Sequence, residues 1–246
     1  MKKTTPPTLT CDSDKIVASV DETSDDFLLK GVKAYDDRSG DVSDTLMVQS
    51  ISNFIQKNTV IVTYAAVDEG NNVGRLERTL IYTDYKEPVF KLKSPLLFTT
   101  GTNVPFLRNI SADSSIDGNL TTQIRYGLDS IVDNNTPAAY PITFRVTDSN
   151  GKTSYLETEI VILSSIYASA DISLKDYLIY IPKNSEFNEK TAEKYISSVS
   201  VEYEKEELTI DCPVDTKTPG IYHVDYTLNT NKVSGKTRLI VVVESD

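Results

Sequence analysis

The protein has 246 residues, of which 39% are hydrophobic, and it contains 14 Tyr but no Trp. Its 25 Lys and Arg face 36 Asp and Glu, which gives a formal net charge of 25 − 36 = −11 and an isoelectric point near 4.7. A surface this acidic repels nucleic acid and anionic lipid, so the composition disfavours both as partners. The longest apolar stretches, such as Leu239 to Val243, are only strand-sized, and we therefore expect no membrane insertion.

The two cysteines indicate neither metal nor redox chemistry. Cys11 and Cys212 lie 212 − 11 = 201 residues apart, and no Cys-x-x-Cys motif is present. In a chain built of modules these two residues fall in different modules. We therefore expect no disulfide within a module.

The first part of the chain contains an acidic loop and then a predicted hairpin. The loop is YDDRSGDVSD, Tyr35 to Asp44. Apolar and polar residues then alternate from Val60 to Ala66, which is typical of a half-buried strand. A turn rich in Gly and Asn follows, and a second strand is predicted from Leu76 to Thr83.

The middle part of the chain repeats this order. Its acidic loop is ADSSIDGNL, Ala112 to Leu120. Residues Tyr140, Ile142, Phe144 and Val146 alternate with polar residues, which predicts a strand with one buried face. The turn DSNGK leads to a closing strand predicted from Tyr155 to Leu163.

The last part of the chain keeps the hairpin and lacks the acidic loop. Tyr222, Val224, Tyr226 and Leu228 form the apolar face of its first strand, and the closing strand is predicted from Lys236 to Glu244. The stretch FNEKTAEKYISSV, Phe187 to Val199, has apolar residues at helical spacing. It predicts a helix in a loop of this part.

These three parts form a repeat of about eighty residues. Tyr64 aligns with Phe144, at a separation of 144 − 64 = 80, and Phe144 aligns with Tyr226, at 226 − 144 = 82. Short strands at such regular spacing indicate β-sandwiches. The short linkers between them predict an elongated rod with limited bending. The predicted domains are 1–86, 87–165 and 166–246.

The order of these motifs resembles that of bacterial immunoglobulin-like repeats. The motifs are GVKAYDDRSGDVSD and VTYAAVDEGNN in the first part, ISADSSIDGNL and FRVTDSNGK in the second, and PGIYHVDY in the third. Similar repeats occur in Gram-positive surface proteins and beside pesticidal crystal proteins, and hyalin and cadherin repeats are similar in outline. The resemblance implies an all-β fold of three tandem immunoglobulin-like β-sandwich domains. It also implies an extracellular location, a role in spacing or adhesion, and no enzymatic activity.

The acidic loops are the candidate metal site. Asp36, Asp37 and Asp41 cluster in the first loop, and Asp113 and Asp117 lie in the second. A calcium ion takes six to eight oxygen ligands, which carboxylates and carbonyls supply. The alternative is that these residues shape turns, because Asp accepts hydrogen bonds from nearby backbone amides.

The second acidic loop and the first linker each resemble part of a known calcium site. From Asp113 the second loop imitates the start of an EF-hand loop, but Ile124 stands at the twelfth position, where a bidentate Glu belongs. The linker TDYKEPVF resembles the calcium-binding joint of cadherins, with Asp84 and Glu87 as ligands beside Glu69 of the preceding turn. Tyr85 and Lys86 depart from that pattern. The alternative is a proline that begins an edge strand.

Catalytic chemistry has little support in the sequence. The single histidine, His223, is predicted on the outward face of a strand beside Asp225, which is the position of a surface residue. The glycines are scattered in turns and form no phosphate-binding loop. We therefore predict no catalytic residues and no cofactor other than calcium.

The tyrosines have two interpretations. Tyr140 and Tyr222 begin equivalent strands, like the corner tyrosine of immunoglobulin domains, whose hydroxyl bonds to local backbone. Four others belong to the third part of the chain, where they are predicted either to fill the core or to lie exposed as anchors for a sugar or protein. These four are Tyr177, Tyr180, Tyr195 and Tyr203.

The sequence as a whole predicts a non-catalytic spacer, protein-interaction or adhesion region at the cell surface or in a secreted protein. The expected partner is a protein or a glycan. The start MKKTTPPTLT lacks the apolar stretch of a signal peptide, and the repeat favours a fragment of an exported protein over a cytoplasmic protein. Three alternatives stay open: a carbohydrate-binding module, a calcium-stiffened adhesin, and an accessory region of a larger secreted enzyme.

Overall fold

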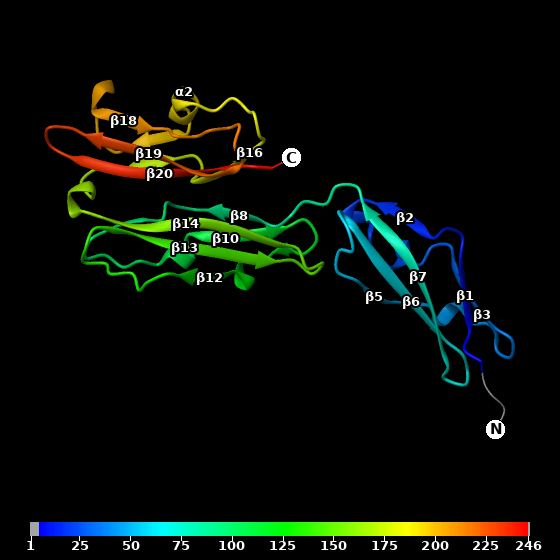
Figure 1. Ribbon diagram of the computed structural model, residues 1–246. Helices are drawn as coiled ribbons and strands as arrows, with labels where there is room; N and C mark the ends of the chain where they lie inside the picture. Colours follow the sequence, from blue (N-terminus) through cyan, green and yellow to red (C-terminus); the bar gives the residue numbers. More distant parts are fainter. Residues whose placement is uncertain (1–4, 246) are drawn as a thin grey trace. The chain divides into compact units, whose positions relative to one another are not determined.

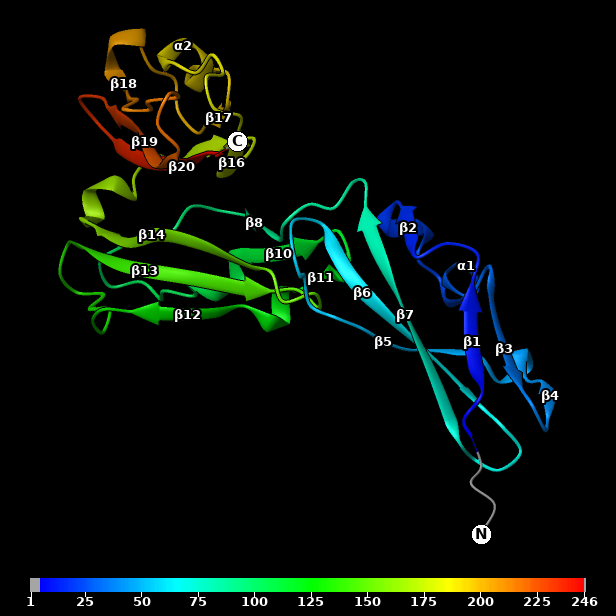
Figure 2. The same ribbon diagram turned by 45° about the vertical axis from the view of Figure 1, so that its right-hand side comes forward.

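The structure, a computed structural model, describes residues 5–245 (Figure 1; Figure 2). The chain forms two compact units. The first comprises the chain up to Pro88 together with Ser114–Gly118 and Thr147–Thr153, and the second comprises the remainder. Nearly all regular structure in the described residues is β, as the sequence predicts. No helix in this part of the chain is long and apolar enough to cross a membrane.

The first sandwich, in the first unit, consists of two sheets around one core. Leu9 and Ala34 of one sheet and Val60, Tyr64 and Leu80 of the other are buried in that core. The first sheet has the order β1 (Thr8–Cys11), β3 (Val32–Asp36), β4 (Gly40–Asp41). The second has the order β2 (Lys15–Ala18), β7 (Val73–Tyr82), β6 (Thr59–Val67), β5 (Met47–Ile51). A one-turn helix, α1 (Asp25–Leu28), precedes β3.

The second sandwich follows the same plan. Phe90 and Ala112 come from its smaller sheet, and Ile142, Phe144 and Ile160 from its larger one. The smaller sheet has the order β8 (Val89–Leu92), β10 (Ile110–Ser114), β11 (Gly118–Asn119). The larger has the order β9 (Leu97–Thr99), β14 (Thr153–Leu163), β13 (Ala138–Thr147), β12 (Arg125–Leu128).

The third sandwich has a smaller first sheet. That sheet pairs β15 (Ile172–Leu174) with β17 (Ile196–Val199). The other has the order β16 (Leu178–Ile181), β20 (Ser234–Val243), β19 (Gly220–Asn229), β18 (Leu208–Asp211). Single turns of 3₁₀ helix occur in all three sandwiches, at η1 (Val20–Glu22), η2 (Ser43–Thr45), η3 (Phe106–Arg108), η4 (Thr121–Gln123), η5 (Ser165–Tyr167) and η6 (Lys205–Glu207).

The larger sheets of the three sandwiches have equivalent strand orders. In each, a long antiparallel hairpin is flanked on one side by an antiparallel strand and on the other by a short early strand. The short strand pairs in parallel with the closing strand, as in β2 with β7, β9 with β14 and β16 with β20. The sequence predicted the hairpins and did not reveal this parallel strand, because three or four residues are too few to show a period.

The predicted inward faces of the hairpins are confirmed. In β6, Val60, Val62, Tyr64 and Ala66 are all 0% exposed. Ile142, Phe144 and Val146 of β13 are buried, and so are Val224, Tyr226 and Leu228 of β19. The period of two along a strand therefore identifies the core of each sandwich.

The predicted helix at Phe187–Val199 is much shorter in the structure. The helix α2 spans Glu189–Glu193, and the side chain of Asn188 accepts a hydrogen bond from the backbone N–H of Thr191 at its start. Ile196 and Val199, which the helical spacing placed on one helix face, belong to strand β17. Ala192, on the predicted apolar face, is buried, and Phe187 is buried too. A short helix and a short strand follow each other directly here, so their apolar residues together imitate the spacing of one longer helix.

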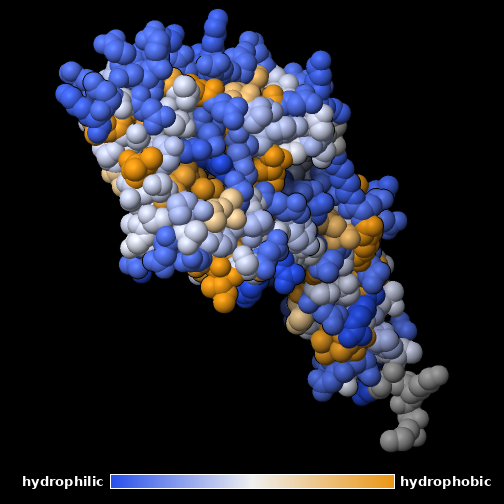
Figure 3. All heavy atoms as spheres, turned by 60° about the vertical axis from the view of Figure 1, so that its left-hand side comes forward, coloured by the Kyte–Doolittle hydropathy of each residue, from blue (hydrophilic) through white to orange (hydrophobic). Residues whose placement is uncertain are grey.

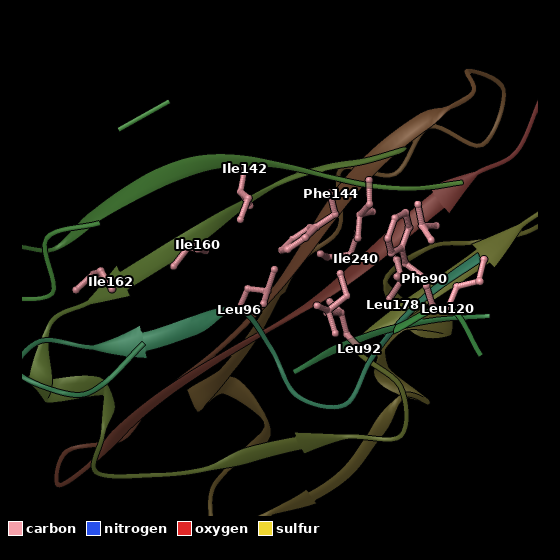
Figure 4. Packing of buried hydrophobic residues seen from close by; sticks show 14 residues of the cluster. Phe90, Leu92, Leu96, Leu120, Ile142, Phe144, Ile160, Ile162, Leu178 and Ile240 are labelled. Atoms are coloured by element: carbon pink, nitrogen blue, oxygen red, sulfur yellow. The ribbon is translucent and has the colours of Figure 1, made fainter. Parts of the chain in front are cut away.

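The second and third sandwiches pack against each other within the second unit. Leu178 of β16 and Ile240 of β20 belong to the same hydrophobic cluster as the core of the second sandwich. Figure 4 shows these two side chains beside Phe90 and Leu92. The backbone N–H of Phe90 also donates to the hydroxyl of Tyr180, at 3.0 Å.

This packing differs from the expected rod. A rod requires the joint between sandwiches to leave their sheets apart, whereas here the larger sheet of the third sandwich packs on the second. The short linker permits both arrangements. The apolar residues that decide between them, Leu178 and Ile240, read in the sequence as ordinary strand residues.

Two buried tyrosines tie the hairpins to the short helices. The hydroxyl of Tyr64 donates to the backbone oxygen of Leu28 in α1 at 2.9 Å, and that of Tyr226 donates to the oxygen of Ala192 in α2 at 2.8 Å. The aligned residue of the second sandwich is Phe144, which packs near the rings of Phe90 and Phe106. This position of the repeat is therefore Tyr in the two sandwiches where a helix carbonyl accepts the hydroxyl, and Phe in the sandwich where rings surround it.

Exchanging Tyr and Phe at this position tests the arrangement. We expect Tyr226→Phe to lower the free energy of unfolding by about 1 kcal/mol, because it removes one internal hydrogen bond. We expect Phe144→Tyr to lower it by about 1–3 kcal/mol, because the new hydroxyl is buried among rings. Urea unfolding measures both. A Phe144→Tyr variant as stable as the parent would contradict this account of the repeat.

Candidate functional site

The first acidic loop is a turn whose carboxylates bind their own backbone. Asp36 is buried, and its Oδ1 accepts hydrogen bonds from the N–H groups of Ser39 and Arg38, at 2.6 and 3.0 Å. The hydrogen bond from the N–H of Ser39 is the main reason why the pKa of Asp36 lies below its usual value. Asp41 accepts from the N–H of Ser43 at 2.9 Å. Asp37, by contrast, is exposed.

The second acidic loop has the same turn built from different residues. Ser114 stands where Asp36 does, and its hydroxyl accepts from the N–H groups of Ile116 and Asp117, at 3.1 and 3.2 Å. Asp113 instead forms an ion pair with Lys91 at 2.7 Å. The Oδ2 of Asp117 accepts from the N–H of Ser149 at 2.8 Å. The shared feature of the two loops is therefore a side-chain oxygen at the turn and not a set of acids.

The hairpin turns show the same rule in all three sandwiches. The Oδ1 of Asp68 accepts from the N–H of Asn72, and that of Asp148 accepts from the N–H of Lys152, both at 2.8 Å. In the third sandwich the hydroxyl of Thr230 takes this position and accepts from the N–H of Val233 at 2.9 Å. Thr230 lies 230 − 148 = 82 residues after Asp148, as the repeat requires.

The predicted metal residues are not brought together as one ligand shell. Among residues 5–245, no group of three or more His, Cys, Asp or Glu is arranged to hold a metal ion. Asp36 and Asp41 are engaged with backbone N–H groups, which already satisfy part of their hydrogen-bonding capacity. Calcium binding at Asp36, Asp37, Asp41, Asp113 and Asp117 stays a prediction that titration has to test.

The cadherin-like linker residues are also engaged within the first unit. Asp84 accepts from the hydroxyl of Ser19 at 2.7 Å and from the N–H of Val20 at 2.8 Å. Glu87 forms an ion pair with Lys152 at 2.7 Å. Tyr85, one of the residues that departs from the cadherin pattern, has its ring 4.6 Å from that of Phe54. Its hydroxyl donates to Asp148 at 2.6 Å, and burial together with this bond raises its pKa.

A charged network lies where the second and third sandwiches meet in the second unit. The guanidinium of Arg238 on β20 donates to both carboxylate oxygens of Asp225 on β19, at 2.6 and 3.0 Å. It also pairs with Glu159 on β14, so one side chain connects the two sandwiches. The Nζ of Lys236 lies 3.0 Å from Asp225. Burial alone would raise the pKa of Asp225, but its bonds with Arg238 and Lys236 outweigh burial and lower it.

His223 belongs to this network and is not the exposed residue that the sequence predicted. Its Nε2 lies 3.1 Å from the hydroxyl of Thr158, and its Nδ1 lies 3.3 Å from Arg238 and 3.7 Å from Glu159. Its side chain is 27% exposed because this face of β19 lies against β14 and not against solvent. Burial and the charge of Arg238 lower its pKa, although Glu159 and Asp225 act in the opposite direction.

The corner tyrosines behave as predicted. The hydroxyl of Tyr140 donates to the backbone oxygen of Asp133 at 3.1 Å, and that of Tyr222 donates to Thr218 at 2.9 Å. Of the four tyrosines with two interpretations, three are partly buried against the cores, namely Tyr177, Tyr180 and Tyr195. Tyr203 is 38% exposed.

The second unit also contains a pocket of about 440 Å³. It lies between the end of β9, the turn η5, strand β15 and the start of β20. Phe98, Tyr167 and Tyr177 line it together with Asp171 and Lys236. The sequence does not predict this pocket, because its lining comes from segments about 70 residues apart and no local motif joins them.

The fold places the chain in the class of tandem β-sandwich proteins. No protein-family model matches it. An uncharacterized 81.3 kDa protein of Acholeplasma phage L2 is 30% identical over 111 residues, which are 44% of this chain and 15% of that protein. The chain thus spans a small part of the length of this curated relative.

Several solved structures contain similar regions. The CBM51-2 and INT domains of Clostridium perfringens ZmpB are 16% identical, with 59% of this chain and 25% of that chain covered and a TM-score of 0.23. Human CDH23 EC21-23 is 12% identical, with 97% and 100% covered and a TM-score of 0.22. The cadherin domains of protocadherin gamma B2 are 10% identical, with 98% and 60% covered and a TM-score of 0.22. At these TM-scores the similarity assigns no function to the chain.

Two neighbouring aspartates of the first loop provide a matched pair of variants. We expect Asp36→Ala to lower the melting temperature by several degrees, because two backbone N–H groups lose their acceptor. Asp37→Ala should leave it nearly unchanged, since exposed side chains away from such bonds matter little. Melting curves with calcium and with chelator test the metal at the same time. A calcium-dependent shift that both variants abolish would contradict the turn interpretation.

The single histidine makes a clean pH experiment possible. The folded pKa of His223 lies below its unfolded value of about 6.5, so the folded state binds fewer protons than the unfolded state in this range. The resulting stability is present above the unfolded pKa and is lost as the pH falls through it. We expect the free energy of unfolding, measured with urea, to decrease from about pH 7.5 to 5.5. His223→Gln should remove most of this decrease, and an unchanged pH dependence in the variant would contradict the assignment.

Proposed function

We propose that the chain is a non-catalytic region of an extracellular surface protein or secreted protein, and that it spaces and presents a surface for binding a glycan or protein. We assign it three domains, 1–86, 87–165 and 166–246. The observation that carries the proposal is the joining of the second and third sandwiches through a shared apolar cluster and the Arg238 network. This joining favours a presenting role because it keeps loops from both sandwiches in fixed positions.

The polar groups of the loops support the same proposal. Asp68, Asp148 and Thr230 each hold a hairpin turn, and Asp36 and Ser114 hold the equivalent earlier turns. Side chains used in this way give rigid loop ends. Rigid loops on a β-scaffold are a common platform for recognition.

The character of the surface agrees with a binding region that stays in solution. The face in Figure 3 is largely hydrophilic, with separate hydrophobic patches. The exposed large hydrophobic residues include Ile131, Tyr155, Ile166 and Tyr126, which come from different elements. Scattered residues of this kind are normal on a monomer, so binding is expected at particular pockets or loops.

A cell-binding assay with a chemical discriminator tests the proposal. We expect the fluorescently labelled chain to bind intact cells or immobilised surface extracts in a saturable way, and the heat-unfolded chain to bind without saturation. Periodate treatment should abolish binding to a glycan, and protease treatment should abolish binding to a protein. The mass of a bound glycan or peptide should stay the same after long incubation. Absence of saturable binding, or conversion of the bound molecule, would overturn the proposal.

A further inference from the structure

The pocket of the second unit has the size and walls of a small-ligand site. Its volume of about 440 Å³ falls within the usual range for such sites, about 300–1,000 Å³. Its lining comes from three stretches of the chain, within residues 95–102, 163–177 and 236–237. Because these segments belong to both sandwiches, the pocket depends on the packing that holds the sandwiches together.

Aromatic side chains form part of the walls. Phe98 and Tyr177 are partly buried against the core of the second sandwich, and the hydroxyl of Tyr177 accepts a hydrogen bond from the N–H of Leu174. Tyr167, on η5, is half-buried and belongs to none of the core clusters of the described residues. Its ring therefore lines the pocket without being required by a core. Aromatic rings of this kind provide apolar contact area with a polar tip.

Polar groups stand beside these rings. Asp171 is exposed at the pocket, and among residues 5–245 its carboxylate has no side-chain hydrogen bond or ion pair. Thr237 is 2% exposed and also lines the pocket, and its hydroxyl has no hydrogen-bond partner in the described part of the chain. Because this hydroxyl has almost no accessible surface, a ligand in the pocket cannot reach it. The carboxylate of Asp171 can accept hydrogen bonds from a ligand with hydroxyl groups.

We propose that this pocket binds the ring of a neutral sugar, a hexose or an N-acetylhexosamine. A sugar ring has an apolar face for the wall of Tyr167 and a rim of hydroxyls that can donate to Asp171. Lys236 is already paired with Asp225, and the chain carries a net charge of −11, so an anionic sugar is disfavoured. The inference rests on the proposed binding function and names its ligand class.

Titration of the whole chain with methyl glycosides tests the inference. The probes are the methyl glycosides of glucose, galactose, N-acetylglucosamine and N-acetylgalactosamine, with methyl glucuronide as the anionic comparison. Chemical shifts of labelled Tyr and Thr report the site and the affinity. We expect at least one neutral glycoside to saturate and to shift Tyr167 and Thr237, and the glucuronide to bind at least tenfold more weakly.

Three variants distinguish the pocket from the rest of the surface. Tyr167→Ala should weaken binding at least tenfold, and Asp171→Asn should weaken it several-fold while keeping the shape of the side chain. Tyr155→Ala removes a tyrosine that is 60% exposed elsewhere on the second sandwich and should have no effect. Melting temperatures of the three variants verify that they are folded.

The outcomes separate this inference from the proposed function. If no neutral glycoside saturates, or if Tyr167→Ala binds as tightly as the parent, the pocket is not the sugar site. In that case saturable binding to cells would still support the proposed function, and the binding surface would lie outside this pocket. If the chain binds neither glycosides nor cells, both proposals fail.

Discussion

Each sandwich depends on one constraint, which is that its long hairpin buries every second side chain along its first strand. In β6 the four residues from Val60 to Ala66 on this face are fully buried. Three aligned residues in each of the other hairpins are buried too, namely Ile142, Phe144 and Val146 of β13 and Val224, Tyr226 and Leu228 of β19. A shift of one residue in register would move all of them to the other face. The turns that fix the register are therefore as important as the apolar residues themselves. This explains why Asp68, Asp148 and Thr230 each accept a hydrogen bond from a backbone N–H on the far side of the turn.

The second and third sandwiches add an interface to this common plan. Leu178 and Ile240 contribute apolar contact, and Arg238 with Glu159 contributes a charged contact beside it. Buried ion pairs are weak sources of stability, because the charges lose their hydration. Buried ion pairs instead restrict how two protein surfaces can pack, because any other alignment of the surfaces leaves a buried charge unpaired. We attribute the geometry of the interface to the network and most of its stability to the apolar cluster.

The sequence predicted the hairpins, their inward faces and the corner tyrosines because these follow from local patterns. Tyr140 and Tyr222 were identified by their place at the start of a strand, and both make the expected bond. The pairing of Asp225 with Arg238 could also be predicted from the sequence, because the two residues lie opposite each other in the two strands of one hairpin. The contact of Arg238 with Glu159 could not be predicted, because it depends on how two sandwiches pack. The pocket could not be predicted for the same reason. In the acidic loops the composition alone could not show that Asp36 and Asp41 accept hydrogen bonds from backbone N–H groups of their own turn.

The parallel pairing of each short early strand with the closing strand has a mechanical consequence. Force applied along the chain pulls the early strand of a sandwich toward its start and the closing strand toward its end. Since the two strands run in the same direction, this force slides them past each other and loads their hydrogen bonds simultaneously. An antiparallel pair at the same place would open one bond at a time. Each sandwich thus resists extension through three or four residues of β2, β9 or β16, and these short strands set the tension that the chain can transmit before a sandwich yields.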